Sequence, residues 1–311
     1  MSVKTYFIAG FLGAGKTTLL NNLLRELSDK RTAVIMNEFG QVNIDLELIE
    51  YKEGMELSEI NNGSIFCTCL SGSFVKRIVE LAKLPLDYLL VESSGMARPA
   101  SIGTILDQVD QLADKSIDYQ GMITIVDATT YLKLVKSVNA VQEQVIYSDL
   151  VIINKIDLVD ESLISEIEKS ILLLNPGVEI VKTKFARVDN IFEQGYYVSE
   201  YKERQPLEEC GRDKGMFKTL LKTKKRISEK SLLKFIEALL TQTFRIKGLV
   251  KTEGGLVHVD CAGEQLKIDR LEGNDPGPDN SQLIFISNEK EIKKLVEKGW
   301  QDNVAVEYKI I

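Results

Sequence analysis

The sequence has few of the residues on which several classes of protein depend. It contains one histidine, His258, and acidic residues outnumber basic ones, so that the formal net charge is −7. A nucleic-acid-binding protein needs a basic surface to meet the phosphate backbone, and this composition does not favour one. No apolar stretch reaches the length of a membrane span, and no cationic segment precedes the first apolar run. We therefore expect a cytoplasmic protein with no membrane segment and no nucleic-acid partner.

Cysteine is also scarce. Four cysteines in 311 residues are too few for a disulfide framework, so we expect reduced thiols. The length is sufficient for two domains and a substantial core. The cysteines are Cys67, Cys69, Cys210 and Cys261.

Short apolar runs typical of β-strands alternate with helical stretches through the first two-thirds of the chain. This alternation favours an α/β fold, in which a mainly parallel sheet is covered by helices on both faces. Ligands of such folds bind at the carboxyl ends of the strands. The predicted strands are Val3 to Ala9, Thr32 to Met36, Tyr88 to Val91, Met122 to Val126, Leu150 to Ile153 and Val178 to Val181.

The stretch from Gly10 to Thr18 fits the phosphate-binding pattern G-x-x-x-x-G-K-[ST] of P-loop NTPases. It lies between the first predicted strand and a helix predicted for Thr17 to Ser28. Glycines let successive main-chain N–H groups turn inward and, with the positive end of the helix dipole, meet phosphate oxygens. We expect Lys16 to reach the β- and γ-phosphates and the Thr17 hydroxyl to bind Mg²⁺. A glycine-rich turn without a ligand is the alternative. The expected phosphate contacts come from Gly10, Gly13, Ala14, Gly15, Lys16, Thr17 and Thr18.

Two polar segments after later strands are placed to meet the γ-phosphate. The loop from Asn37 to Asp45 resembles a switch segment, in which Glu38 and Asp45 are the candidates for orienting a hydrolytic water and Asp45 for binding Mg²⁺. Solvated carboxylates are the alternative reading. The third predicted strand ends at Glu92, which we expect to hold Mg²⁺ directly or through water, and Gly95 lets a main-chain N–H approach the γ-phosphate.

The fifth predicted strand leads into an N-K-x-D element, Asn154 to Asp157. The Asp157 carboxylate can accept hydrogen bonds from N1–H and the exocyclic amine of guanine, a donor pair that adenine lacks. We expect Asn154 to bond the other edge of the base and the Lys155 stem to lie along its face. The element therefore predicts a guanine nucleotide, GTP or GDP.

A polar, irregular stretch from residue 184 to 213 indicates a domain boundary near residue 205, which gives domains 1–205 and 206–311. The second domain is predicted to be a small α+β unit. Its strands are expected at Met216 to Thr223, two or three between Phe244 and Ile268, and one at Gln282 to Ser287; its helices are expected at Ser231 to Thr243 and Glu289 to Lys298.

The order and spacing of these motifs resemble those of the CobW-type GTPases, relatives of the UreG and HypB metal-enzyme chaperones. The resemblance covers nearly the whole chain. It implies GTP hydrolysis, with slow intrinsic turnover that a partner raises, coupled to delivering a metal or readying a metal- or corrinoid-dependent client enzyme. The segments that carry it are Gly10 to Thr18, Asn37 to Gly40, Glu92 to Gly95, Asn154 to Asp157, Phe244 to Leu249 and Gln282 to Ile286.

The chain departs from this family at the cysteine motif G-C-x-C-C. In Gly63 to Cys69, only Cys67 aligns with a family cysteine, and Cys69 is an additional one. Thiolates suit Zn²⁺ or Co²⁺, but a closed zinc site needs four donors. The others would come from Glu38, from Cys210 or Cys261, from a second subunit in a homodimer, or from a client. Cysteines that only fill a small apolar space are the alternative.

Two other functions fit the phosphate-binding pattern. A small-molecule kinase would need an acceptor pocket and an arginine-bearing lid, and it would leave the N-K-x-D element without a role. A non-catalytic adaptor would bind GTP as a folding ligand and recruit a partner through the second domain.

The incomplete cysteine motif favours conformational gating of a cofactor-dependent client over delivery of a free metal ion.

Overall fold

The computed structural model describes residues 2–37, 56–60, 71–112, 117–192, 217–262, 265–271 and 280–311. The chain divides into two compact units, Met1–Cys210 and Gly211–Ile311. The predicted boundary near residue 205 falls outside the described residues and stays a prediction. Within the described residues, no helix combines the length and the apolar character needed to cross a membrane.

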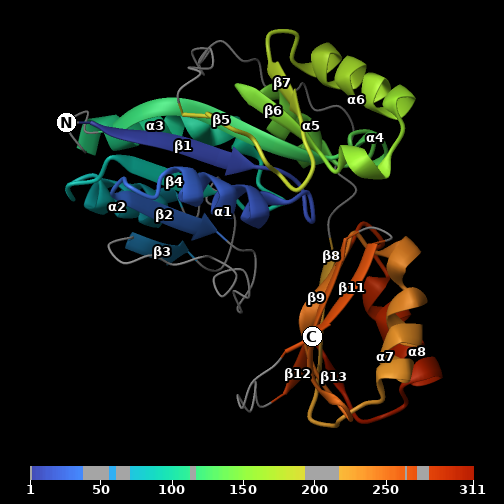
Figure 1. The fold of residues 1–311 in the computed structure, drawn as a ribbon. Helices are drawn as coiled ribbons and strands as arrows, with labels where there is room; N and C mark the ends of the chain where they lie inside the picture. The colour runs from blue at the N-terminus through green and yellow to red at the C-terminus, as the bar shows by residue number, and fades with distance from the viewer. Residues whose placement is uncertain are drawn as a thin grey trace. The chain divides into compact units, whose positions relative to one another are not determined.

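The first unit is built on a seven-stranded sheet in the order β3-β2-β4-β1-β5-β6-β7 (Figure 1). All neighbouring strands are parallel, which confirms the predicted α/β class. Because β1 lies between β4 and β5, the segments that follow these three strands meet at one edge of the sheet. The strands are β1 Val3–Ala9, β2 Thr32–Asn37, β3 Glu56–Ile60, β4 Tyr88–Glu92, β5 Ile117–Asp127, β6 Leu150–Asn154 and β7 Glu179–Lys182.

Helices cover both faces of this sheet. Successive residues of a strand point to opposite faces, so Phe7 packs with α2 (Ser71–Leu81) and α3 (Ile102–Leu112), whereas Ile8 packs with α1 (Lys16–Glu26). Continuous burial of the central strands on both faces explains why they appear as unbroken apolar runs. The remaining helices of this unit are α4 Tyr131–Leu134, α5 Asn139–Ile146 and α6 Glu161–Leu174.

The sequence predicted six strands and missed β3. Its five residues include two glutamates, and among the described strands it lies at the edge of the sheet and pairs with β2 alone. An edge strand needs no apolar run, so the apolar signal is absent. As a result Glu92 ends the fourth strand of the sequence and Asn154 the sixth. β5 also begins at Ile117 rather than at Met122, because its first four residues are only half-buried.

The second unit is an antiparallel sheet in the order β11-β10-β9-β12-β8-β13, with α7 and α8 side by side on one face (Figure 1). This confirms the predicted α+β character. Helix α7 starts at Glu229, two residues before its predicted start, because the Ser228 side chain caps it by accepting from the Ser231 main-chain N–H at 3.1 Å. The elements are β8 Phe217–Thr223, α7 Glu229–Glu237, β9 Arg245–Thr252, β10 Gly255–Ala262, β11 Gln265–Arg270, β12 Ser281–Ser287, α8 Ile292–Asn303 and β13 Lys309–Ile310.

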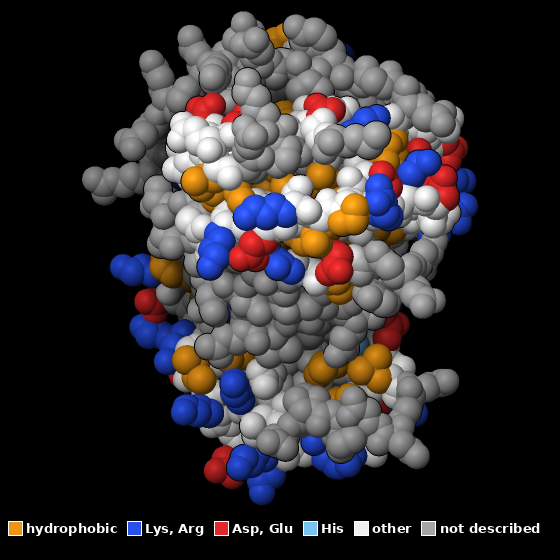
Figure 2. Space-filling model, turned by 90° about the vertical axis from the view of Figure 1, so that its left-hand side faces the viewer, with side chains coloured by type: hydrophobic (Ala, Val, Ile, Leu, Met, Phe, Trp, Pro, Cys, Tyr) orange, Lys and Arg blue, Asp and Glu red, His pale blue; other side chains and the backbone are white. Residues whose placement is uncertain are grey.

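Charges of both signs are mixed on the surface. On the face drawn in Figure 2, Lys and Arg side chains lie among Asp and Glu side chains over the described residues. Exposed ion pairs include Arg31 with Asp87 at 3.1 Å and Arg77 with Glu80 at 3.2 Å. Such exposed pairs are screened by water and contribute little, so the apolar cores carry most of the stability.

Candidate functional site

The phosphate-binding pattern forms the turn between β1 and α1. Gly10, Gly13 and Gly15 have φ angles of 147°, 77° and 111°, a region that side chains disfavour. Space is also restricted: a Cβ on Gly10 would lie 2.4 Å from the Ile125 carbonyl oxygen, and one on Gly15 would lie 2.6 Å from Nδ2 of Asn154. Glycine is therefore required at both positions by backbone conformation and by packing.

Lys16, the first residue of α1, folds back over this turn. It is buried, and its Nζ donates to the Phe11 carbonyl oxygen at 3.4 Å. Thr17 is half-buried and Thr18 is exposed, while Ala14 is buried beneath the turn. The ammonium group and the turn's main-chain amides thus gather in a compact arrangement at the start of α1, as anion binding requires.

The segment after β4 lies against the same turn. Glu92 is in register with Ile8 of β1, and the Ser93 N–H and hydroxyl both donate to the Ile8 carbonyl oxygen, at 2.9 and 3.1 Å. A Cβ on Gly95 would lie 2.8 Å from the main-chain nitrogen of Leu12. The structure therefore brings Glu92, Gly95 and the turn together. The Thr17 hydroxyl and the buried Glu92 carboxylate are hard oxygen donors, a set that suits Mg²⁺.

Asn154 connects this turn to the segment after β7. Its Nδ2 donates to the Ala14 carbonyl oxygen at 2.9 Å, and its Oδ1 accepts from the Ala186 N–H at 2.9 Å. The side chain is 3% exposed. The N-K-x-D pattern predicts that this amide contacts a base; in the structure it forms hydrogen bonds with main chain on both sides.

The other two polar residues of the N-K-x-D element are positioned differently from each other. Lys155 has a left-handed φ of 62°, and its Nζ lies 2.5 Å from Oδ2 of the buried Asp127. Asp157 lies in the 3₁₀ turn Ile156–Leu158, with an exposed side chain. The Asp157 carboxylate is thus accessible to a ligand. The ion pair with Asp127 restrains the Lys155 side chain.

Two parts of this site were not predicted from the sequence. Asp127 ends β5 and also accepts from the Thr129 N–H and hydroxyl at 2.9 and 2.6 Å, but the predicted strand stopped one residue earlier. The segment after β7 holds Phe185 and Ala186 in left-handed conformations, and the Asn22 amide of α1 donates to both of their carbonyl oxygens, at 3.1 and 2.8 Å. The sequence offered one signal for both parts. Each lies at or just after the end of a predicted parallel strand, and the carboxyl ends of such strands lie at the same edge of the sheet.

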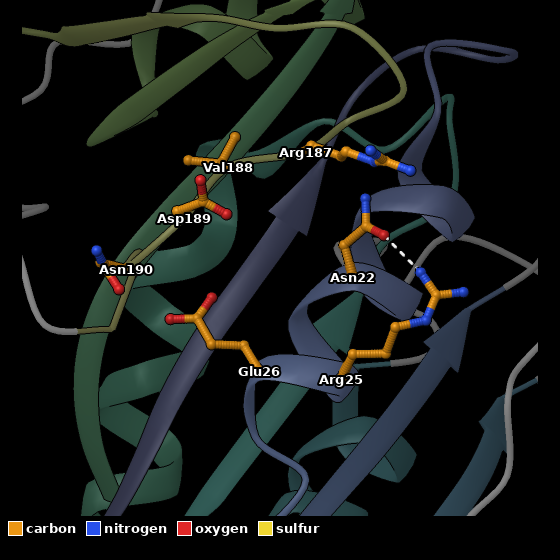
Figure 3. A pocket seen from close by; sticks show the side chains of 7 residues that line it. All are labelled: Asn22, Arg25, Glu26, Arg187, Val188, Asp189 and Asn190. Atoms are coloured by element: carbon orange, nitrogen blue, oxygen red, sulfur yellow. Dashed lines mark hydrogen bonds between the residues drawn. The ribbon is translucent and has the colours of Figure 1, made fainter.

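A polar pocket of about 500 Å³ opens beside this segment (Figure 3). Helix α1 lines one side and residues 187–190 the other. The side chains of Asn22 and Arg25 are joined by a hydrogen bond of 2.8 Å, which orients the Asn22 amide toward the segment after β7. The lining residues are Asn22, Arg25, Glu26, Arg187, Val188, Asp189 and Asn190.

Several predicted site residues lie outside the described residues: Glu38, Asp45, Cys67, Cys69 and Cys210. Their assigned roles stay predictions. Across the ranges that the structure does describe, no three His, Cys, Asp or Glu side chains gather closely enough to hold a metal ion.

Cys261 is not available as the additional metal donor that sequence analysis considered. It is 1% exposed within the apolar core of the second unit, and burial raises the pKa of its thiol to about 12. Its neighbour Asp260 pairs instead with Arg245 at 3.3 Å on the opposite face of β10. Asp260 and Cys261 therefore do not contribute to one site.

We expect Cys261 to resist alkylation in the folded protein. A thiol with a pKa near 12 has a thiolate fraction of about 10⁻⁴ at pH 8, against roughly a quarter for an ordinary cysteine. Peptide mapping after iodoacetamide treatment should show labelling at least about 100-fold slower than in urea-unfolded protein. Equal rates in the two states would show that Cys261 is accessible and ionised.

Family models match both units of the chain. The family model described as "CobW/HypB/UreG, nucleotide-binding domain" matches residues 4–182, and the one described as "Cobalamin synthesis protein cobW C-terminal domain" matches residues 218–301. The zinc-regulated GTPase metalloprotein activator 1 of Dictyostelium discoideum is 32% identical over 212 residues, covering 57% of this chain and 44% of that protein. The zinc chaperone YjiA of Escherichia coli is 33% identical over 165 residues, or 51% of each chain.

The chain thus spans about half the length of these curated relatives. A crystal structure of Zn(II)-bound YjiA GTPase from E. coli covers 97% of this chain and 99% of that one, at 20% identity and a TM-score of 0.49. The resemblance inferred from the motifs is confirmed by the two family models. Because the first of them alone matches more than half of the 311 residues, the chain belongs to the CobW/HypB/UreG family.

Proposed function

We propose that this protein binds GTP with Mg²⁺, hydrolyses it slowly to GDP and phosphate, and couples the cycle to metal delivery or to activation of a client metalloenzyme. The observation that carries the proposal is the Asn154 amide, which joins the phosphate-binding turn to the N-K-x-D element. One side chain thereby fixes the spacing between a triphosphate site and a guanine-selective carboxylate. The relatives named above as a GTPase metalloprotein activator and a zinc chaperone support the coupling to metal.

Each part of the site has a defined task in this proposal. The amides of Gly13 to Thr18 and the Lys16 ammonium bind the phosphates, and Asp157 selects guanine. Thr17 and Glu92 would hold Mg²⁺, which when bound would supply positive charge that offsets the negative charge of the phosphates. Hydrolysis then proceeds by in-line attack of water with little covalent help from the protein. Glu38 and Asp45 remain the candidates for orienting that water, with Asp45 as a further Mg²⁺ ligand.

The client side of the cycle depends on residues beyond the nucleotide site. We propose that Cys67 and Cys69 supply two thiolates to a Zn²⁺ or Co²⁺ ion, whose remaining donors come from Glu38, Cys210, a second copy of the chain or the client. Two thiolates are fewer than a closed site needs. This favours a protein whose conformation gates a metal- or corrinoid-dependent client over one that carries a free ion.

Steady-state phosphate release tests the catalytic part. The wild type with Mg²⁺ should hydrolyse GTP on the order of 10⁻³ to 10⁻² s⁻¹ or slower, since a GTPase of this kind depends on a partner for faster turnover. Lys16→Ala should lose GTP binding and turnover, because the variant lacks the cation at the β- and γ-phosphates. Unchanged hydrolysis by Lys16→Ala, or hydrolysis of ATP as fast as GTP, would contradict the proposal. GTP binding without turnover in the wild type would favour the adaptor alternative.

A further inference from the structure

Gln144, a buried residue near the end of α5, holds the main chain that follows β4. Its Nε2 donates to the carbonyl oxygens of Gly95 and Ala97, at 3.2 and 3.0 Å. Gln144 is 1% exposed, and hydrogen bonds in so dry an environment are stronger than those in water. One amide group therefore holds two main-chain carbonyl oxygens of residues 95–97.

The opposite side of this segment presses against the phosphate-binding turn. Gly95 lies so near Leu12 that a Cβ would meet its main-chain nitrogen at 2.8 Å and its side chain at 2.6 Å. Gly95 is thus confined between the turn and the Gln144 amide. Without the hydrogen bonds from Gln144, the carbonyl groups of Gly95 and Ala97 would lose their attachment to α5.

The preceding residue of α5 supports the same segment. Glu143 is 3% exposed, and its Oε1 accepts from Nε of Arg98 at 2.8 Å and also from the Arg98 Nη2. Arg98, by contrast, has a side chain that is 54% exposed. An unpaired charge is costly in a buried position, so the Glu143 carboxylate favours the conformation in which Arg98 pairs with it. This pair holds the end of the segment against α5.

Helix α5 provides a firm base for these contacts. The Gln144 carbonyl oxygen accepts from the Thr124 hydroxyl of β5 at 3.0 Å, and the Asn175 amide at the end of α6 donates to the Val145 carbonyl oxygen at 3.0 Å. These bonds attach α5 to the sheet on one side and to α6 on the other. The position of Gln144 is therefore set by the core, independently of any ligand.

We infer that Gln144 is a positioning residue for γ-phosphate recognition: it places the Gly95 main chain against the phosphate-binding turn and so sets the preference for GTP over GDP. The inference rests on the proposed function, because it takes the Gly95 N–H as the group that meets the γ-phosphate. GDP has no γ-phosphate, so this contact contributes to the affinity for one nucleotide only. Selectivity is a difference of two affinities, and Gln144 acts on that difference.

Calorimetric titration with GDP and with a slowly hydrolysed GTP analogue tests this inference on the full chain. Gln144→Met keeps the length of the side chain and removes the donor. We expect the affinity for the GTP analogue to fall about tenfold, while the affinity for GDP stays within about twofold of wild type. An equal fall for both nucleotides would overturn the inference.

Gln142→Met is the matched control. Gln142 lies on the same helix, and its Nε2 also donates to a main-chain carbonyl oxygen, but that of Val135. We expect this variant to bind both nucleotides as the wild type does, and a GTP-selective loss would refute the role assigned to Gln144. If Gln144→Met does not fold, Glu143→Gln replaces it, since it weakens the Arg98 pair without changing volume. A selective loss of about threefold for the GTP analogue supports the inference, and no selective loss overturns it.

A wild type that binds neither nucleotide would instead refute the proposed function. The two failures are therefore distinguishable from the wild-type titration alone.

Discussion

Replacing Asp157 by asparagine is expected to transfer the base preference of this protein from guanine to xanthine. In the proposed function, the Asp157 carboxylate accepts from N1–H and from the exocyclic amine of guanine. Asparagine offers one acceptor and one donor, which match the N1–H and the C2 carbonyl of xanthine. Loss of a charge-assisted pair of hydrogen bonds should lower GTP affinity by about 10²- to 10³-fold. Competition binding with GTP and XTP measures the exchange.

Asp157→Ala is the control for this experiment, because it removes the acceptor without adding a donor. It should weaken GTP binding without improving XTP binding. The Asp157 side chain is exposed, so neither variant should change the unfolding temperature by more than a few degrees. If Asp157→Asn retained its preference for GTP, another residue would select the base.

Asn154→Ala is expected to have the largest effect on the architecture of the site. The substitution removes the hydrogen-bond partner of the buried Ala14 carbonyl and of the buried Ala186 N–H. Each unsatisfied group costs about 1–3 kcal/mol, so we expect a loss of about 2–6 kcal/mol in the free energy of unfolding. Since the Asn154 amide also links the phosphate-binding turn to the segment after β7, nucleotide affinity should fall more than tenfold. Chemical denaturation and nucleotide titration measure the two effects.

Asn175→Ala separates the two effects of Asn154. The Asn175 amide donates to the carbonyl oxygens of Val145 and Ser148, at 3.0 and 2.9 Å, and so also restrains main chain, but away from the turn. We expect lower stability with GDP affinity within about twofold of wild type. Equal losses of affinity in the two variants would mean that Asn154 acts only through general stability.

The strand-to-helix turn of the proposed nucleotide site could be predicted because its signals are local. Glycine at positions 10, 13 and 15 follows from the positive φ angles of a tight strand-to-helix turn, which leave few other residues acceptable. The lysine that follows identifies the turn as one for anions. The central strands could be identified in the same way, because burial on both faces requires an unbroken apolar run.

Other features lacked a local signal. The edge strand β3 needs no apolar run, so its two glutamates concealed it. Cysteine is a common metal ligand, so the residue type alone does not show that Cys261 is unreactive. Only its position in the apolar core shows this. Gln144 stands in an ordinary helical sequence, and its importance comes from two carbonyl groups almost fifty residues earlier in the chain.

Local patterning was thus enough to predict the central strands and the glycine-rich turn, and to propose the base-selective carboxylate, each within a few consecutive residues. The placement of β1 between β4 and β5, the use of Asn154 as a link to Ala14 across 140 residues, and the confinement of Gly95 all depended on how the helices and strands pack. Such contacts form between residues remote in sequence, and their geometry follows from strand order and crossover direction. No short stretch of the chain carries that information.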